Sequence, residues 1–279
     1  LMRKAQETTR VAIEAMMKHA YPGVNEGELE GAFDFALLKQ GVRQHAFTSI
    51  VAGGPRATTL HYADNNCVVE DGQMVLIDLG SAEGNYCADI SRTFPVNGKF
   101  TDRQRDIYNI VLSAHQQAPE NMRAGAKYME DVHRKALITL AEGLRGVGLI
   151  NGSAEDAVAA GAMFLFMPHG LSHGMGIDVH DCEAMGERSY DFSAIAERAA
   201  ESATCIHRAT WRLRAGTVMS NEPGIYFIPA LIDKSRSEGL YKGIVNYDKL
   251  DNYRTFGGIR IEDDVIVTKD GGRVIGGDK

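Results

Sequence analysis

The chain has 279 residues, of which 44% are hydrophobic, and its formal net charge is −7. This length can bury a large core in one or two domains. Because there is no basic stripe and no apolar run long enough to cross a bilayer, we expect neither a nucleic acid nor a membrane as a partner. The four cysteines lack the spacing of a structural zinc site, and isolated thiols are typical of the cytoplasm.

The first hundred residues predict two helices followed by strands. Residues 1–21 carry a rough apolar stripe, and a Pro-Gly pair ends that segment. Asn25 is a candidate N-cap for a second helix over 26–40, and residues 48–52 favour a strand. The first helical pattern starts at Leu1 without an N-cap. This fits either a frayed start or a preceding domain that is absent from this polypeptide.

The most informative stretch is an acid-bearing hairpin. Its first apolar run, residues 74–79, contains Asp78, and the chain turns at Glu83-Gly84 and returns with Asp89. A hairpin centred on that turn places the two aspartates opposite each other, where like charges are destabilising. A divalent metal between them would remove the repulsion, because hard cations favour carboxylate oxygen. The alternative is an exposed loop acid plus a capping acid.

The rest of the chain repeats this order of elements. Its predicted helices and strands cover 101–121, 129–146, 217–227 and 258–267, and Thr101 is a candidate N-cap. Helix, turn, helix and acid-bearing strands thus occur twice. We therefore predict an α+β fold with two pseudo-symmetric halves, roughly 1–100 and 101–279, around one shared site. The polar segments 183–210 and 229–256 are interpreted as insertions between core elements.

Three histidines gather in one glycine-rich segment. His169, His173 and His180 lie between residues 167 and 181, where glycines allow close backbone approach to a ligand. A single histidine is more often structural, but three in such a segment favour a functional site.

Two later segments carry further acids. Glu222 interrupts a strand pattern just before Pro-Gly, although a turn-facing acid is an equal interpretation. On the last strand, a period of two puts Arg260, Glu262 and Asp264 on one face. The ordinary alternative for that strand is a sheet with one solvated face.

Two aspartates, one histidine and two glutamates are enough to hold two metal ions that share bridging carboxylates. Oxygen-rich ligation favours Mn²⁺, with Co²⁺, Fe²⁺ or Zn²⁺ as alternatives. Two such metals can deprotonate a bridging water and polarise a carbonyl. The residues therefore predict amide hydrolysis without a covalent enzyme intermediate.

In this order, the residues resemble those of the pita-bread metallopeptidases, a family that includes methionine aminopeptidases, aminopeptidase P and prolidase. The resemblance implies a single catalytic domain over 1–279, with a curved antiparallel sheet and a homodimeric assembly. It implies that Asp89 and Glu262 bridge two metals. The other metal ligands would be Asp78, His173 and Glu222.

Within the family, the motifs from Pro168 to His173 and from Glu222 to Phe227 look most like those of prolidases, which hydrolyse the Xaa-Pro bond of dipeptides. The resemblance implies catalytic roles for His61, His169, His180 and Glu222, and substrate-binding roles for His61, His180, Arg208 and Arg260. Arg208 would grip the free carboxylate of a dipeptide. The alternatives are an aminopeptidase P-like enzyme acting on longer peptides and a non-catalytic pita-bread scaffold. Relatives with proline specificity usually carry an N-terminal domain, and we expect that this sequence represents the catalytic domain without it.

Overall fold

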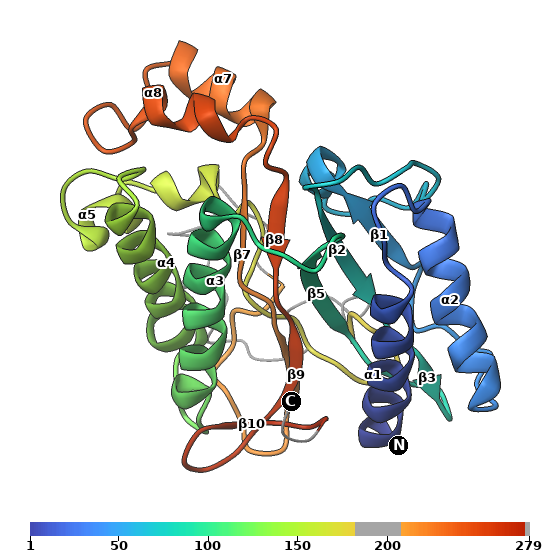
Figure 1. Ribbon diagram of the computed structural model, residues 1–279. Helices are drawn as coiled ribbons and strands as arrows, with labels where there is room; N and C mark the ends of the chain where they lie inside the picture. The colour runs from blue at the N-terminus through green and yellow to red at the C-terminus, as the bar shows by residue number, and fades with distance from the viewer. Residues whose placement is uncertain (182–207, 277–279) are drawn as a thin grey trace.

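The structure is a computed structural model that describes residues 1–181 and 208–276 (Figure 1). Its helices are α1 (Met2–Lys18), α2 (Glu26–Lys39), α3 (Asp102–Asn121), α4 (Arg134–Gly146), α5 (Ala154–Ala159), α7 (Pro229–Ser237) and α8 (Tyr247–Leu250). Its strands are β1 (Ile50–Gly53), β2 (Met74–Leu79), β3 (Ala82–Glu83), β4 (Tyr86–Cys87), β5 (Ile90–Pro95), β6 (Val218–Asn221), β7 (Gly224–Tyr226), β8 (Gly258–Arg260), β9 (Asp263–Val267) and β10 (Gly272–Val274). This mixture of helices and antiparallel strands confirms the predicted α+β class.

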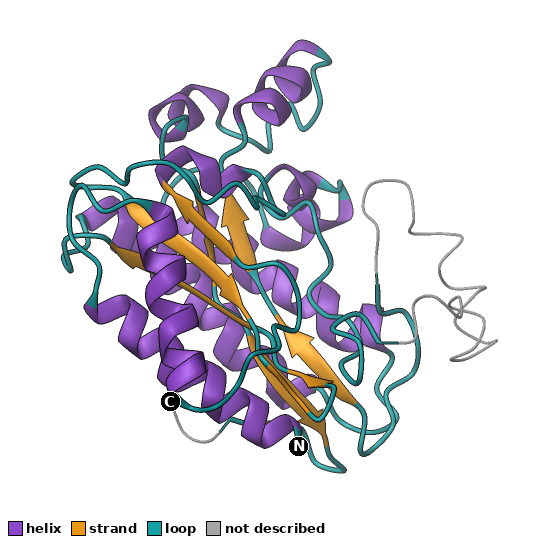
Figure 2. Ribbon diagram, turned by 90° about the vertical axis from the view of Figure 1, so that its right-hand side faces the viewer, coloured by secondary structure: helices purple, strands orange, loops and turns teal. Residues whose placement is uncertain are grey.

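The strands occupy the middle of the molecule, between two pairs of helices (Figures 1 and 2). They form two three-stranded antiparallel sheets, in the orders β1-β2-β5 and β10-β9-β6, and two strand pairs, β3-β4 and β7-β8. Helices α1 and α2 pack on the first sheet, whereas α3, which packs against α4, covers the second. Residues far apart in the sequence can therefore meet where the two sheets adjoin.

The predicted caps of two helices are confirmed. Asn25 caps α2 and Thr101 caps α3, each in a reciprocal capping box in which the third helical residue bonds back to the cap. Such boxes satisfy two backbone N–H groups that a helix start otherwise leaves without partners. The local sequence is therefore sufficient to fix where these two helices begin.

The acid-bearing hairpin forms, but its register differs from the prediction. The turn centres on Gly84-Asn85, both with positive φ, as a two-residue type I′ turn requires. Moving the centre by one residue shifts every pairing by two, so Asp78 pairs with Ser91. Asp89 is a diagonal neighbour of Asp78, not its direct partner.

The later segments depart from the prediction in two places. Residues 229–256 are not an insertion, because α7 and α8 form there and bury Ile232 and Leu250 in the core. The helix expected over 129–146 begins as a π-helical turn over Tyr128–His133. Most of the other predicted insertion, 183–210, lies outside the described residues.

None of the helices that the structure describes is long and apolar enough to span a membrane.

Candidate metal centre

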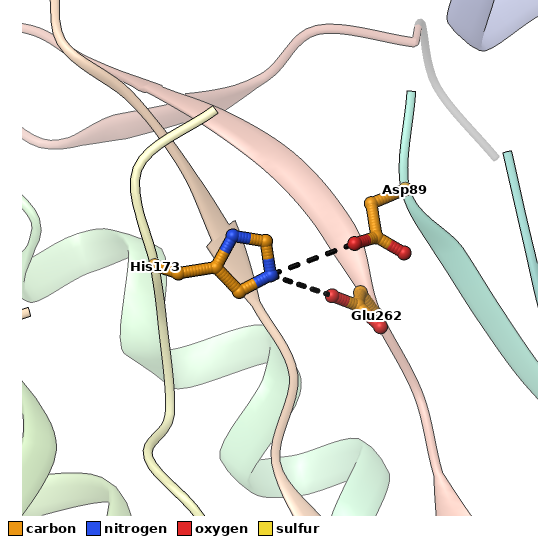
Figure 3. A group of neighbouring side chains, drawn as sticks. All are labelled: Asp89, His173 and Glu262. Atoms are coloured by element: carbon orange, nitrogen blue, oxygen red, sulfur yellow. Dashed lines mark ion pairs between the residues drawn. The ribbon is translucent and has the colours of Figure 1, made fainter. Parts of the chain in front are cut away.

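Three side chains from distant parts of the chain meet where the two sheets adjoin (Figure 3). Asp89 precedes β5, Glu262 lies between β8 and β9, and His173 lies in the glycine-rich segment. The His173 Nε2 atom is 3.5 Å from the Asp89 Oδ2 atom and 3.9 Å from the Glu262 Oε1 atom. All three side chains are buried, so they form an enclosed group of oxygen and nitrogen donors.

Glu222 and Asp78 complete the set that the sequence predicts. The Glu222 Oε1 atom is 3.5 Å from His173 Nε2, and Glu222 stands in the break between β6 and β7. Burial is the largest cause that raises the pKa of Asp89, Glu222 and Glu262, and the charge of Asp78 adds to the rise in each. Glu222 therefore adjoins the group of three through His173, and Asp78 lies near enough to act on its charges.

The donor set fits a divalent cation. One oxygen of each of three buried carboxylates has no hydrogen-bond partner within the described residues: Asp78 Oδ1, Asp89 Oδ1 and Glu262 Oε1. Burial, together with the neighbouring acids, raises the pKa of Asp89 and Glu262 well above the usual range and that of Glu222 to about 8. Buried anions without partners are costly, and a bound cation both bonds these oxygens and offsets their charge.

A single buried arginine organises one side of the centre. The Arg260 guanidinium donates to Asp78 Oδ2 (2.6 Å), Ser91 Oγ (2.8 Å) and the Tyr226 hydroxyl (2.8 Å). Burial is the largest single influence on Asp78 and acts to raise its pKa, but the Arg260 charge together with the hydrogen bonds to Arg260, Ser91 and Asp89 lowers that pKa below its ordinary value. Ser91 in turn donates to Glu262 Oε2 at 2.6 Å. A direct role of Arg260 in substrate binding stays a prediction, since its three nitrogens are bonded to protein groups.

The backbone orients the ring of His173. Its Nδ1 atom lies 3.2 Å from the carbonyl oxygen of Gly174. A carbonyl accepts the Nδ1 proton and so leaves the Nε2 lone pair facing the carboxylates, the usual arrangement of a metal-bound histidine. Burial and the nearby His180 lower the pKa of His173 to about 3, so the ring is neutral at neutral pH.

His169 and His180 flank this centre as predicted. The His169 Nε2 atom is 3.1 Å from the Tyr226 hydroxyl, and its Nδ1 atom is 2.8 Å from the Gly170 carbonyl oxygen. The ring of His180 is 4.6 Å from that of His173. Burial is the largest cause that lowers the pKa of both flanking histidines to about 4. Both rings are therefore neutral near pH 7.

Two predicted substrate residues lie at the edge of the site. His61 is exposed, and its charge acts on His169 and His180. Arg208 is partly buried, and its charge acts on His173, His180 and Glu222. Both side chains are therefore near enough for their charges to act on groups of the centre.

Sequence reasoning missed several groups that support the ligands. The Tyr226 hydroxyl links Arg260 to His169. Tyr226 follows Glu222 by four residues in a strand-like segment, so the period of two could have indicated that both lie on the same side. Gln6 on α1 donates to Asp264, whose Oδ2 atom also accepts the backbone N–H of Asp89 at 3.3 Å. In the sequence, Gln6 is only a polar residue on the apolar side of a predicted helix, which is a weak indication that it supports a site.

Comparisons with known proteins agree with this geometry. The profile of metallopeptidase family M24 matches residues 1–269, so the chain belongs to that family. It is 38% identical over 271 residues to a probable Xaa-Pro aminopeptidase of Botryotinia fuckeliana, with 97% of this chain and 57% of the relative covered. It is 36% identical to a probable Xaa-Pro aminopeptidase of Sordaria macrospora, with 97% and 56% covered.

Solved structures show the same pita-bread fold. Aminopeptidase P from Escherichia coli in complex with product superimposes with a TM-score of 0.78 at 32% identity, over 99% of this chain and 54% of that one. Proline aminopeptidase P II from Yersinia pestis gives a TM-score of 0.78 at 33% identity, over 99% and 55%. The chain therefore spans about half the length of the relatives it matches.

Proposed function

We propose that this chain is a metal-dependent peptidase that removes the residue preceding proline at the N-terminus of peptides, an Xaa-Pro aminopeptidase. The observation that carries the proposal is the buried group of Asp89, His173 and Glu262, whose unpartnered carboxylate oxygens suit a divalent cation. The names of the relatives support the peptide class. They favour longer peptides over the dipeptides that the prolidase-like motifs had suggested.

The chain offers a residue for each task in peptide hydrolysis. Asp78, Asp89, His173, Glu222 and Glu262 would hold two divalent ions, Mn²⁺ being our preferred assignment. Bound ions of this kind supply a nucleophile from water and polarise the scissile carbonyl.

The remaining roles belong to side chains around the ions. Glu222 lies beside His169 and His173 and, ionised when a metal is bound, is suited to accept a proton and return it to the leaving amine. His180 is neutral and can donate a hydrogen bond to the developing oxyanion. His61 would contact the peptide from the rim of the site. The His169 Nδ1 atom donates to the Gly170 carbonyl oxygen, and its Nε2 atom is within hydrogen-bond distance of the Tyr226 hydroxyl.

The test is a peptide panel with the purified, Mn²⁺-loaded protein. We expect release of the first residue from Ala-Pro-Ala and no cleavage of Ala-Ala-Ala. No turnover of any Xaa-Pro peptide by a folded, metal-loaded sample would overturn the proposal. Metal analysis belongs in the same experiment, because a sample that binds no metal after Mn²⁺ incubation would instead favour a non-catalytic scaffold.

A second candidate, cleavage of Xaa-Pro dipeptides, is supported by the location of Arg208. Its charge acts on three groups of the centre, so it can pair with the free carboxylate of a dipeptide. In that case, Arg208→Ala should weaken Ala-Pro binding and leave Ala-Pro-Ala turnover unchanged. Equal effects on both substrates would contradict carboxylate recognition by this side chain.

The cellular location and the oligomeric state of the enzyme are also proposals. Cys67 and Cys87 are free thiols, which supports a cytoplasmic location. A homodimer is proposed on the family resemblance alone, and sedimentation of the purified chain would test it.

A further inference from the structure

A further buried carboxylate, away from the metal centre, lies at the start of α2. Glu26 is fully buried, and each of its oxygens accepts two hydrogen bonds. Its Oε1 atom accepts from the Gly53 backbone N–H (2.7 Å) and Arg56 Nε (2.6 Å). Its Oε2 atom accepts from the Tyr62 hydroxyl (2.9 Å) and the Cys67 backbone N–H (3.0 Å). This is far more bonding than a helix start requires.

Two of these four donors belong to the segment that carries His61. Residues 59–67 contain no helix or strand, so no ladder of backbone hydrogen bonds fixes them. Glu26 fastens this segment through the Tyr62 side chain, next to His61, and again at Cys67, where the Glu26 backbone N–H also donates to the Cys67 carbonyl oxygen at 2.9 Å. Asn65 adds a third attachment by accepting from the Val51 N–H at 2.9 Å.

We propose that Glu26 is a positioning residue for His61: the buried carboxylate holds residues 59–67 so that the exposed imidazole faces the metal centre. The inference rests on the proposed function, in which His61 contacts the peptide. Irregular surface segments move readily unless they are attached. Small displacements of a substrate-contacting group are costly in rate, because productive geometry tolerates little error.

Only a carboxylate suits this location. All four partners are donors, and Glu26 supplies acceptors alone, while Arg56 balances the charge. A glutamine would turn its NH₂ group toward two of those donors in either orientation. Glu26→Gln therefore breaks the attachment without changing the shape of the side chain, and Tyr62→Phe removes only one of its bonds.

The experiment is a double-mutant cycle with Tyr62→Phe and His61→Ala, measured as kcat/KM on Ala-Pro-Ala. We expect Tyr62→Phe to lower kcat/KM by about 3- to 10-fold, the effect of one buried hydrogen bond. In the His61→Ala background, Tyr62→Phe should have almost no effect on kcat/KM, because the imidazole that Tyr62 helps to position is absent. Equal losses in both backgrounds would overturn the proposal.

Amide hydrogen exchange provides a readout that does not depend on activity. Exchange of residues 59–67 should accelerate in Tyr62→Phe and more so in Glu26→Gln, while exchange of β2 is unchanged. The matched control is Tyr128→Phe, a change at a tyrosine that is also buried, in the other part of the molecule. Unchanged exchange of 59–67 in Tyr62→Phe would refute the positioning role. Absence of turnover in the unmutated chain would refute only the proposed function.

Discussion

The buried carboxylates in this molecule differ in how fully their oxygens are hydrogen-bonded. Glu26 has both oxygens bonded twice. Asp78, Asp89 and Glu262 lie close together, and each leaves one oxygen without a partner in the described part of the chain. The comparison teaches that burial of an acid does not identify a metal ligand. Those three carboxylates of the metal centre are distinguished by lying close to one another and by each having an oxygen that accepts no hydrogen bond from the described residues.

The largest expected effect concerns Asp89, one of the three buried donors that lie within reach of one ion. Asp89→Asn removes a charged oxygen donor of the proposed metal site, so we expect loss of bound metal and a fall in activity of more than about 100-fold, beyond the range for an outer partner of a ligand. Metal content and kcat/KM are the measurements. Asp71→Asn, at an exposed turn acid, is the control. A variant that keeps its metal and its rate would remove Asp89 from the centre.

The second prediction tests whether Arg260 is the internal counter-ion of the centre. Arg260→Met leaves the Asp78 carboxylate buried without its partner, which should cost about 3–5 kcal/mol in the free energy of unfolding. Denaturant unfolding of the metal-free protein measures this cost. Added Mn²⁺ should recover part of it, because the cation replaces the lost positive charge. The exposed Arg273→Met serves as control, and an equal loss there would contradict the assignment.

The third prediction concerns pH and the metal-free protein. Burial raises the pKa of Glu222 from an ordinary 4.5 to about 8, so the folded state favours its protonated form. The stabilising contribution is fully present below about pH 4.5 and is lost as pH rises through about 8. The melting temperature should therefore fall by several degrees between pH 5 and 8. Mn²⁺ should abolish this fall, because metal binding favours the ionised ligands. A metal-free protein that becomes more stable over this range would contradict the prediction.

The smallest expected effect is at the fully bonded acid. Glu26→Gln should lower the free energy of unfolding by about 1–3 kcal/mol, because it leaves buried donors unpaired. Metal content should not change, in contrast to Asp89→Asn. Glu14→Gln, on the exposed side of α1, is the control and should be nearly neutral. Loss of metal in Glu26→Gln would erase the distinction between the two groups of carboxylates.

The sequence by itself determined the local elements and the chemical type of the site. The capping residues Asn25 and Thr101 and the apolar run around Asp78 act through near neighbours in the chain, so their effects can be read without a fold. The order of acids and histidines likewise indicated a metallopeptidase, since ligand chemistry depends on residue type.

Only the tertiary structure decided which groups support that site. The Gly84-Asn85 turn set the hairpin register, because two adjacent candidate turns differed only in the φ angles they could adopt. The pairing of Arg260 with Asp78 spans 182 positions, and Gln6 reaches Asp264 across 258. Such contacts depend on how distant elements pack. No local pattern encodes whether a buried carboxylate, Glu26 or Asp89, will find its partners in the protein.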